Sequence, residues 1–512
     1  MSRRYTPPGH HRGVEAFREH LRGLDPAFDC AGELLGPEGP LAEPLALFGR
    51  EAGNRFAVHP MEGWDGNRDG SPSDLTRRRW RRFGLSGAKL IWGGEAVAVV
   101  PEGRANPNQL FVDGNRLKDC VAWLGILRRE TLAGHEESGI GGERPVIGLQ
   151  LTHSGRLSRP DPPPALPRPL RTQVHPVLDG RLGKAAERPL ISDEQLEEIA
   201  GAYVRAARCV EKAGYDFVDV KCCHGYLLHE LLGANTRPGP YGGSFENRVR
   251  LPLRIVAAVR AACPGLGLGV RLSVGDVAPF AADETGVGVP EGPKTPPGEV
   301  VPGAPDAIRN ARGAAGAPTP PSADLGFGID RSNPALPDPA CVEAIRFIGL
   351  LVETGVEAVN VTMGSPYSCP HLSRPFTYPA SDSYLPPEDP LRSVLRQLAA
   401  VRTVRAAFPR LPLVGTGYSY LQEWLPYVAE AEVGGGHVDF VGLGRMVLAY
   451  PRLPADVLAG RPLDRRRVCR TFSDCTTGPR NNMVSGCYPL DEHYRKTAEF
   501  GRIKEIKKAA AL

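Results

Sequence analysis

The chain has 512 residues and a formal net charge of +4, and 23% of its residues are charged. This small excess of basic residues gives no reason to expect a nucleic-acid partner. We find no run of about eighteen apolar residues, which would be needed for a membrane-spanning helix, and no apolar stretch typical of a secretory signal near the N-terminus. The eleven cysteines are scattered between Cys30 and Cys487 rather than grouped as in a small disulfide framework, so we expect reduced thiols and a cytoplasmic protein.

Short apolar runs followed by helical patterns repeat along the chain. Strands are expected at 55–58, 88–92, 145–151, 217–220, 268–272, 358–361, 413–415 and 438–442, and helices near 246–263, 340–354, 390–408 and 420–431. A further helix begins after Ser192, which forms a capping box with Gln195, and ends at Gly214. Eight such units predict an α/β fold, a (β/α)8 TIM barrel. A doubly wound sheet alternates in the same way, but no Gly-x-Gly-x-x-Gly follows the first strand.

The barrel is expected to occupy residues 51–461, between an N-terminal extension over 1–50 and a short C-terminal tail with cysteines over 462–512. Three long connections, 156–189, 275–339 and 365–390, would lie at the carboxyl ends of the strands, where barrel enzymes have their sites. Loops of this length are usually functional or disordered. We expect the middle of 275–339, which is rich in proline and glycine, to be disordered, and its ends together with the loop 365–390 to cover the substrate side.

The strand at 217–220 runs directly into a group of side chains that can do chemistry. Lys221, His224 and Tyr226 follow it, and side chains at the end of a barrel strand point toward the site. Tyr226 is a candidate proton donor, although its position alone fits a packing tyrosine equally well. Lys221 could form a Schiff base, as a lysine does in some barrels, or could pair with Glu62 or Asp65.

Two glycine-rich turns follow the seventh and eighth expected strands. They are Val414-Gly-Thr-Gly417 and Val441-Gly-Leu-Gly444-Arg445. The usual phosphate site of a barrel lies in these two loops, where glycines allow backbone N–H groups to approach a phosphate and an arginine can clamp it. The turns therefore indicate a mononucleotide site.

The chain resembles the Old Yellow Enzyme family of NAD(P)H:flavin oxidoreductases. Lys221, His224 and Tyr226 stand where that family has a histidine, a histidine or asparagine, and a tyrosine, so the first position departs from its pattern. The family's motif at the next helix is matched closely by Tyr-Gly-Gly-Ser-Phe-Glu-Asn-Arg at 241–248. Further similar elements are Pro60-Met61, followed here by Glu62 rather than a small residue, and Gln-Leu-Thr-His-Ser-Gly-Arg at 150–156.

The resemblance implies FMN as cofactor and NAD(P)H as electron donor. Pro60 and Met61 would run past the flavin ring, Gln150 would bind its pyrimidine edge, and Arg271 would lie near N1 and O2. Gly417, Gly444 and Arg445 would hold the phosphate. A small organic substrate, such as an activated alkene or a nitro compound, would accept a hydride from flavin N5. His224 and Lys221 would polarise it and Tyr226 would give the proton; a lysine at this place suits a carboxylate, a nitro group or an enolate.

Three other readings of the same residues stay open. The flavin could run in the opposite direction, in an amine or N-methyl dehydrogenase. A flavin-free barrel could use Lys221 as a Schiff-base residue, or the protein could bind a flavin or another ligand without catalysis. The sequence leaves the oligomeric state, including a homo-oligomer, undecided.

The tail contains Cys469, Cys475 and Cys487. It resembles longer relatives of the 2,4-dienoyl-CoA reductase and trimethylamine dehydrogenase type, which bind an iron–sulfur cluster after the barrel. The interval from Cys475 to Cys487 matches the last one of their ligand pattern, but Val468 and Thr471 stand at two ligand positions. Four thiolates are needed for such a cluster, so none is expected, and the three cysteines are candidates only for a degenerate site.

Overall fold

The computed structural model describes residues 5–292 and 326–510. Eight parallel strands form its centre: β3 (Phe56–Val58), β4 (Leu90–Ile91), β6 (Val146–Thr152), β7 (Phe217–Cys222), β8 (Gly267–Ser273), β11 (Ala358–Thr362), β12 (Leu413–Gly415) and β13 (Phe440–Leu443). The sheet closes because β13 pairs with β3, where Val441 lies opposite Phe56. The predicted (β/α)8 barrel is confirmed, and all eight predicted strands are present.

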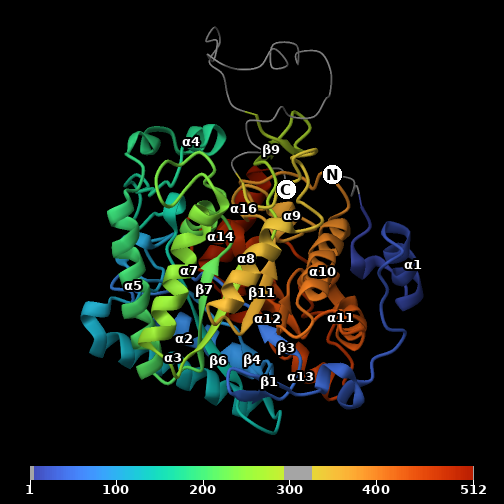
Figure 1. The fold of residues 1–512 in the computed structure, drawn as a ribbon. Coiled ribbons are helices and arrows are strands. Elements are labelled where there is room, and N and C mark those ends of the chain that lie inside the picture. Colours follow the sequence, from blue (N-terminus) through green and yellow to red (C-terminus); the bar gives the residue numbers. More distant parts are fainter. Residues whose placement is uncertain (1–4, 293–325, 511–512) are drawn as a thin grey trace.

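Helices surround the barrel and pack their apolar faces on its strands (Figure 1). They are α2 (Asp74–Leu85), α3 (Leu117–Ser138), α5 (Asp193–Lys212), α7 (Phe245–Ala262), α8 (Val342–Glu353), α10 (Pro390–Ala407) and α11 (Leu425–Gly434). The predicted capping box is present, because Ser192 and Gln195 bond to each other's backbone N–H groups. The helix expected at 420–431 begins later, since Gln422 adopts a φ of 55° at the end of a 3-10 segment (Tyr418–Trp424).

One strand of the barrel sheet was not predicted. β5 (Ala96–Ala98) pairs with the carboxyl half of β6, while β4 pairs with the amino half of the same strand. The chain between β4 and β5 turns at Gly93 and Gly94, which both have positive φ values. The barrel wall between β3 and β6 is therefore built from two short segments, and the turn between them carries Glu95.

The N-terminal extension packs against the barrel at two places. A hairpin of β1 (Leu45–Leu47) and β2 (Arg50–Ala52) brings Phe48 onto Phe217, with ring centroids 4.2 Å apart, so that it closes the amino end of the barrel. Earlier in the chain, Phe17 of α1 (Val14–Leu24) stacks on Trp424 at 5.6 Å. These contacts bury the extension's apolar side chains in the same core as the barrel.

The C-terminal segment folds back over the carboxyl ends of the strands. It contains α14 (Asp474–Arg480), α15 (Glu492–Arg495) and α16 (Ala498–Ala509), drawn in red in Figure 1. Ser485 accepts a hydrogen bond from the backbone of Trp64 at 2.8 Å, and Asp491 forms a bidentate ion pair with Arg78. The predicted tail therefore contributes to the face where the site was expected.

The described ends of the long connection 275–339 are ordered by backbone pairing. β9 (Phe280–Ala282) and β10 (Gly288–Pro290) form an antiparallel hairpin. The disorder predicted for the middle of this connection falls on residues 293–325, which lie outside the described residues. None of the helices in the described part of the chain combines the length and apolar character needed to cross a bilayer.

Candidate active site

Two cavities share a wall at the carboxyl ends of the strands. The larger has a volume of about 440 Å³ and is lined by Lys221, His224 and Tyr226. The smaller has a volume of about 170 Å³ and reaches the two glycine-rich turns after β12 and β13. The residues that line both are Pro60, Met61, His224, Pro366, Arg374 and Arg445. The structure thus brings the residues predicted to hold a nucleotide next to those predicted to act on a substrate.

The smaller cavity is lined by two half-buried arginines, each with one buried nitrogen atom that has no partner. Arg445 donates to Pro375 O at 2.7 Å, while its Nη1 is buried without a partner, and Nε of Arg374 is likewise buried and unpaired. Burial, with Arg445 nearby, lowers the pKa of Arg374 to about 10. Neither arginine forms an ion pair with a carboxylate of the described residues. Two adjacent half-buried cations without a counterion fit a phosphate group.

The turns beside these arginines require glycine at two positions. Gly417 has a φ of 102°, a conformation that other residues rarely adopt. A Cβ atom on Gly442 would lie 2.1 Å from the ring of His59. Gly417, Gly442 and Gly444 line the smaller cavity, as does Arg445. The predicted glycines therefore leave space and backbone N–H groups around the place where the arginines converge.

Arg271 lies at the opposite side of the smaller cavity. It stands on β8 in register with Lys221 on β7, and its Nη1 donates to Pro60 O at 3.4 Å. Its Nε is buried without a partner, and burial lowers the pKa of the guanidinium. A cation is thus fixed beside the Pro60–Met61 backbone, as expected for a group that would face the electron-accepting edge of a flavin.

Gln150 is buried but is not among the residues that line either cavity. Its Nε2 donates to Asp219 Oδ2 at 2.6 Å, and Asp219 also accepts the backbone N–H of Arg271 at 2.6 Å. Burial raises the pKa of Asp219 to about 6. Asp219 was not predicted as a site residue, although a carboxylate between Val218 and Val220 inside an apolar strand is an unusual feature that could have indicated it.

Lys221, His224 and Tyr226 meet in the larger cavity. Nζ of Lys221 lies 3.4 Å from the centroid of the Tyr226 ring, and burial lowers the pKa of the lysine. His224 has a φ of 65°, and its Nε2 lies 3.4 Å from Thr362 Oγ1. Burial also lowers the pKa of His224 well below its usual value, so that its imidazole is neutral at pH 7. The pair therefore offers one buried amine and one neutral ring to a ligand.

Glu62 and Tyr367 contact Tyr226; Glu62 was considered only as a possible partner of Lys221, and Tyr367 was not predicted as part of the site. The Tyr226 hydroxyl forms a short hydrogen bond to Glu62 Oε2 and lies 3.1 Å from the hydroxyl of Tyr367. Asn106 donates to the other oxygen of Glu62 at 3.0 Å. Tyr367 lies in the third long loop, where only the sequence Ser-Pro-Tyr-Ser-Cys-Pro-His could have indicated it. Tyr226 is therefore held in a network that reaches two other connections of the barrel.

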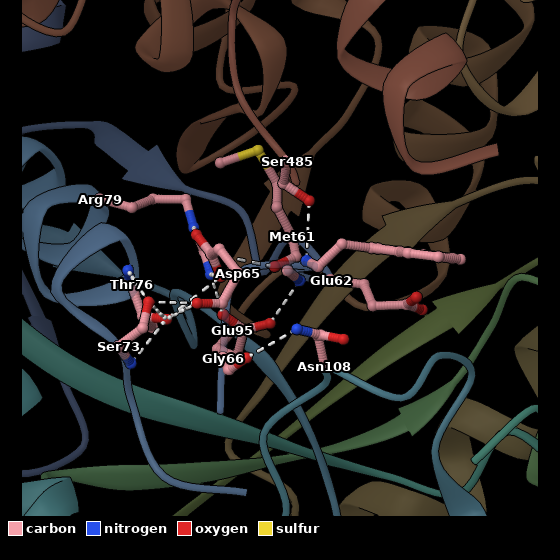
Figure 2. Close-up of polar contacts among 12 residues, drawn as sticks. Met61, Glu62, Asp65, Gly66, Ser73, Thr76, Arg79, Glu95, Asn108 and Ser485 are labelled. Atoms are coloured by element: carbon pink, nitrogen blue, oxygen red, sulfur yellow. Dashed lines mark hydrogen bonds and ion pairs between the residues drawn. The ribbon is translucent and has the colours of Figure 1, made fainter. Parts of the chain in front are cut away.

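The segment that carries Glu62 rests on a buried ion cluster (Figure 2). Arg79 of α2 pairs with Asp65 at 2.8 Å and also contacts Glu95, and its Nη1 donates to Met61 O at 3.4 Å. Glu95 in turn accepts the backbone N–H of Gly63 at 2.6 Å. Asp65 is thus committed to Arg79 rather than to Lys221, and Glu62 is the carboxylate that faces Lys221 in the cavity.

The three tail cysteines lie near the larger cavity. Cys469 and Cys487 are buried, and Cys475 lines the cavity together with Arg374. All three have free thiols. Within residues 5–292 and 326–510 no group of three or more histidine, cysteine or acidic side chains has an arrangement that could hold a metal ion. That the protein lacks an iron–sulfur cluster stays a prediction.

Comparison with known proteins confirms the resemblance to the Old Yellow Enzyme family. The model of the NADH:flavin oxidoreductase / NADH oxidase family matches residues 138–289. NADPH dehydrogenase of Halalkalibacterium halodurans is 28% identical over 232 residues, 44% of this chain and 60% of that protein. NADPH dehydrogenase of Bacillus pumilus is 31% identical over 248 residues, 47% of this chain and 65% of that protein. The aligned segment thus spans less than two thirds of either relative.

Solved structures share the fold over most of the chain. A 2-naphthoyl-CoA reductase in complex with 2-naphthoyl-CoA has a TM-score of 0.63 at 17% identity, covering 89% of this chain and 57% of that one. Histamine dehydrogenase from Rhizobium sp. 4-9 has a TM-score of 0.57 at 19% identity, covering 88% and 52%. The Old Yellow Enzyme homologue from Zymomonas mobilis has a TM-score of 0.52 at 17% identity, covering 83% and 93%. At such identities the likeness concerns the fold alone.

Proposed function

We propose that the protein is an FMN-dependent oxidoreductase that uses NAD(P)H to reduce a small organic acceptor, an activated alkene, a nitro compound or a related molecule. The observation that carries this proposal is the pair of adjoining cavities. One contains Arg374 and Arg445, each with one buried nitrogen that lacks a partner, and the other is lined by Lys221, His224 and Tyr226. The family match supports a flavin, and the phosphate-sized cationic end supports a mononucleotide.

The residues present fit FMN. Arg374, Arg445 and the turns at Gly417 and Gly444 would hold the phosphate, and Pro60–Met61 would pass along the ring. Arg271 would face N1 and O2, where negative charge increases on reduction, and a preorganised cation stabilises that charge. Gln150 keeps its predicted role at the pyrimidine edge as part of the proposal, with Asp219 fixing its amide. When bound, FMN would supply the hydride chemistry.

The protein's own residues would bind and activate the acceptor. Lys221 offers a full positive charge to an oxygen of the substrate, and neutral His224 can donate one N–H to the same group. Both raise the electrophilicity of a conjugated carbon by stabilising charge on that oxygen. Tyr226, which lines the same cavity, would give a proton to the neighbouring carbon.

The charge of the larger cavity argues against an amine substrate. Glu62 is the one carboxylate in its lining. Besides Lys221, the lining contains seven arginines, namely Arg79, Arg156, Arg159, Arg181, Arg374, Arg445 and Arg480. Several of them are paired with carboxylates outside the lining, but Lys221, Arg374 and Arg445 are not. A protonated amine would meet repulsion here, so we favour reduction of an electron-poor acceptor over the amine dehydrogenase alternative.

Binding of FMN and of riboflavin tests this proposal directly. The two ligands share the ring and differ in the phosphate, so Arg445→Ala should weaken FMN binding strongly and riboflavin binding little. The matched control is Arg346→Ala, because this arginine pairs with Glu246 on the exposed surface, where both side chains are more than half exposed. Failure of the wild-type protein to bind FMN would contradict the proposal.

A further inference from the structure

Glu62 and Tyr226 share a hydrogen bond inside the larger cavity. The phenol oxygen and Glu62 Oε2 are in short contact, and Tyr367 lies 3.1 Å from the first oxygen and 3.5 Å from the second. Both tyrosines and Glu62 line the cavity. Three oxygen atoms that can carry protons therefore form one network beside the place where an acceptor would bind.

The protonation state of Glu62 decides which way the shared hydrogen bond points. An ionised carboxylate can only accept, so it would bind the single hydroxyl proton of Tyr226 and keep it from a substrate. A protonated Glu62 can donate to the phenol oxygen instead, which leaves the Tyr226 proton free. The acid function of Tyr226 in the proposed reaction thus requires a carboxylic acid at residue 62.

The surroundings of Glu62 act on its charge in opposite directions. Burial raises the pKa of its carboxyl group. Four neighbours lower this pKa, but the effect of burial is larger: they are Lys221 of β7, Asn106 and Trp64 of neighbouring loops, and Arg480 of α14. Tyr226 and Tyr367 complete the groups that face it. Lys221 lies over the Tyr226 ring, so its charge also stabilises a phenolate there.

We propose that Glu62 is a proton-relay residue that hands its proton to Tyr226 during reduction of the acceptor. This inference rests on the proposed function. The O–H bond of Tyr226 breaks as a C–H bond forms on the substrate, and the phenolate oxygen then takes the proton of Glu62. The carboxylate left behind takes up one proton from bulk solvent, which is the proton consumed in the overall reduction. The relay moves protons only, so it needs no additional oxidant or reductant.

The position of Glu62 also explains why the segment that carries it is so firmly anchored. Its neighbours Met61 and Gly63 are both bonded to the Arg79–Glu95 cluster, and Trp64 is bonded to Ser485 of the C-terminal segment. A proton relay works only if donor and acceptor stay within hydrogen-bond distance. The anchoring keeps the Glu62 carboxyl group at the phenol of Tyr226.

Infrared titration of the resting protein tests the protonation of Glu62 without any turnover. We expect a C=O stretching band of a buried carboxylic acid that is absent from Glu62→Gln and that disappears from the wild type as the pH rises through the raised pKa. Glu505→Gln is the matched control, because this glutamate of α16 is exposed and its loss should leave the band unchanged. A band that is the same in Glu62→Gln and in the wild type overturns the inference.

The pH profile with an acceptor tests the relay itself. The wild-type rate should fall as the pH rises through the Glu62 pKa, whereas Glu62→Gln should be about one-hundred-fold slower or more and should lose that dependence. Glu62→Asp should restore part of the rate together with the pH dependence, and reduction of the wild type by NAD(P)H is measured separately from the return of the electrons to the acceptor. An unchanged pH profile in Glu62→Gln overturns the relay, whereas a wild type that NAD(P)H does not reduce would contradict the proposed function instead.

Discussion

The guanidinium groups of Arg374 and Arg445 line the same cavity, and each keeps a buried N–H group without a partner. Two such cations repel each other unless an anion lies between them. The two residues come from different connections of the barrel, after β11 and after β13, so their convergence is a property of the fold. The proposed phosphate site rests on this convergence.

A phosphate site at Arg374 and Arg445 predicts that inorganic phosphate or FMN stabilises the protein. A ligand that binds only the folded state raises the free energy of unfolding by about 2.7 kcal/mol at one hundred times its dissociation constant. We expect the melting temperature to rise with FMN in the wild type and to rise much less in Arg374→Met. The same melting temperature with and without FMN in the wild type would contradict a phosphate site.

Asp219 should make stability depend on pH. Its pKa is raised to about 6 from 3.8, so the folded protein binds a proton more tightly than the unfolded chain. The contribution of Asp219 is therefore fully present at pH values below about 4 and is lost as the pH rises to about 6, a change on the order of 3 kcal/mol. Urea unfolding at several pH values should show this loss in the wild type and not in Asp219→Asn. Equal pH dependence of the two proteins would exclude Asp219 as the cause.

Lys221 should set the class of acceptor. Replacing its charge in Lys221→Met should lower kcat/KM about ten- to one-hundred-fold for acceptors activated by a carboxylate or a nitro group, since a buried charge contact is lost. Lys221→His, which restores the residue of the resembled family, should favour neutral carbonyl compounds. If Lys221 were instead a Schiff-base residue, borohydride would link a carbonyl substrate covalently to its amine. That result would support the flavin-free alternative.

The ion cluster under residues 61–66 should be important for stability. Arg79→Met leaves the buried carboxylates of Asp65 and Glu95 without their cation, which should lower the free energy of unfolding by about 3–5 kcal/mol. The exposed neighbour Arg77 offers a control on the same helix, and Arg77→Ala should change it by less than about 1 kcal/mol. Urea unfolding measures both values, and similar effects of the two substitutions would disprove the structural role of the cluster.

The strands of the barrel could be predicted because each is a short apolar run buried on both faces, and the strand-end motifs carried Lys221, His224 and Tyr226 with them. β5 was missed because it is only three residues long and follows two glycines. The contact of Glu62 with Tyr226 joins residues 164 positions apart, and that with Tyr367 joins residues 305 positions apart. Such contacts depend on how long loops fold over the barrel, which no local pattern in the sequence contains.

Anaerobic mixing of the FMN-loaded protein with NADH and with NADPH, followed in the visible absorption of the flavin, tests the proposed function most directly. We predict that one or both nucleotides bleach the flavin bands and that a nitro or alkene acceptor then restores them. The control variant is Tyr226→Phe. In this variant the nucleotide should still bleach the flavin bands, but an alkene should restore them only slowly. A wild-type flavin that stays oxidised with both nucleotides would contradict the account.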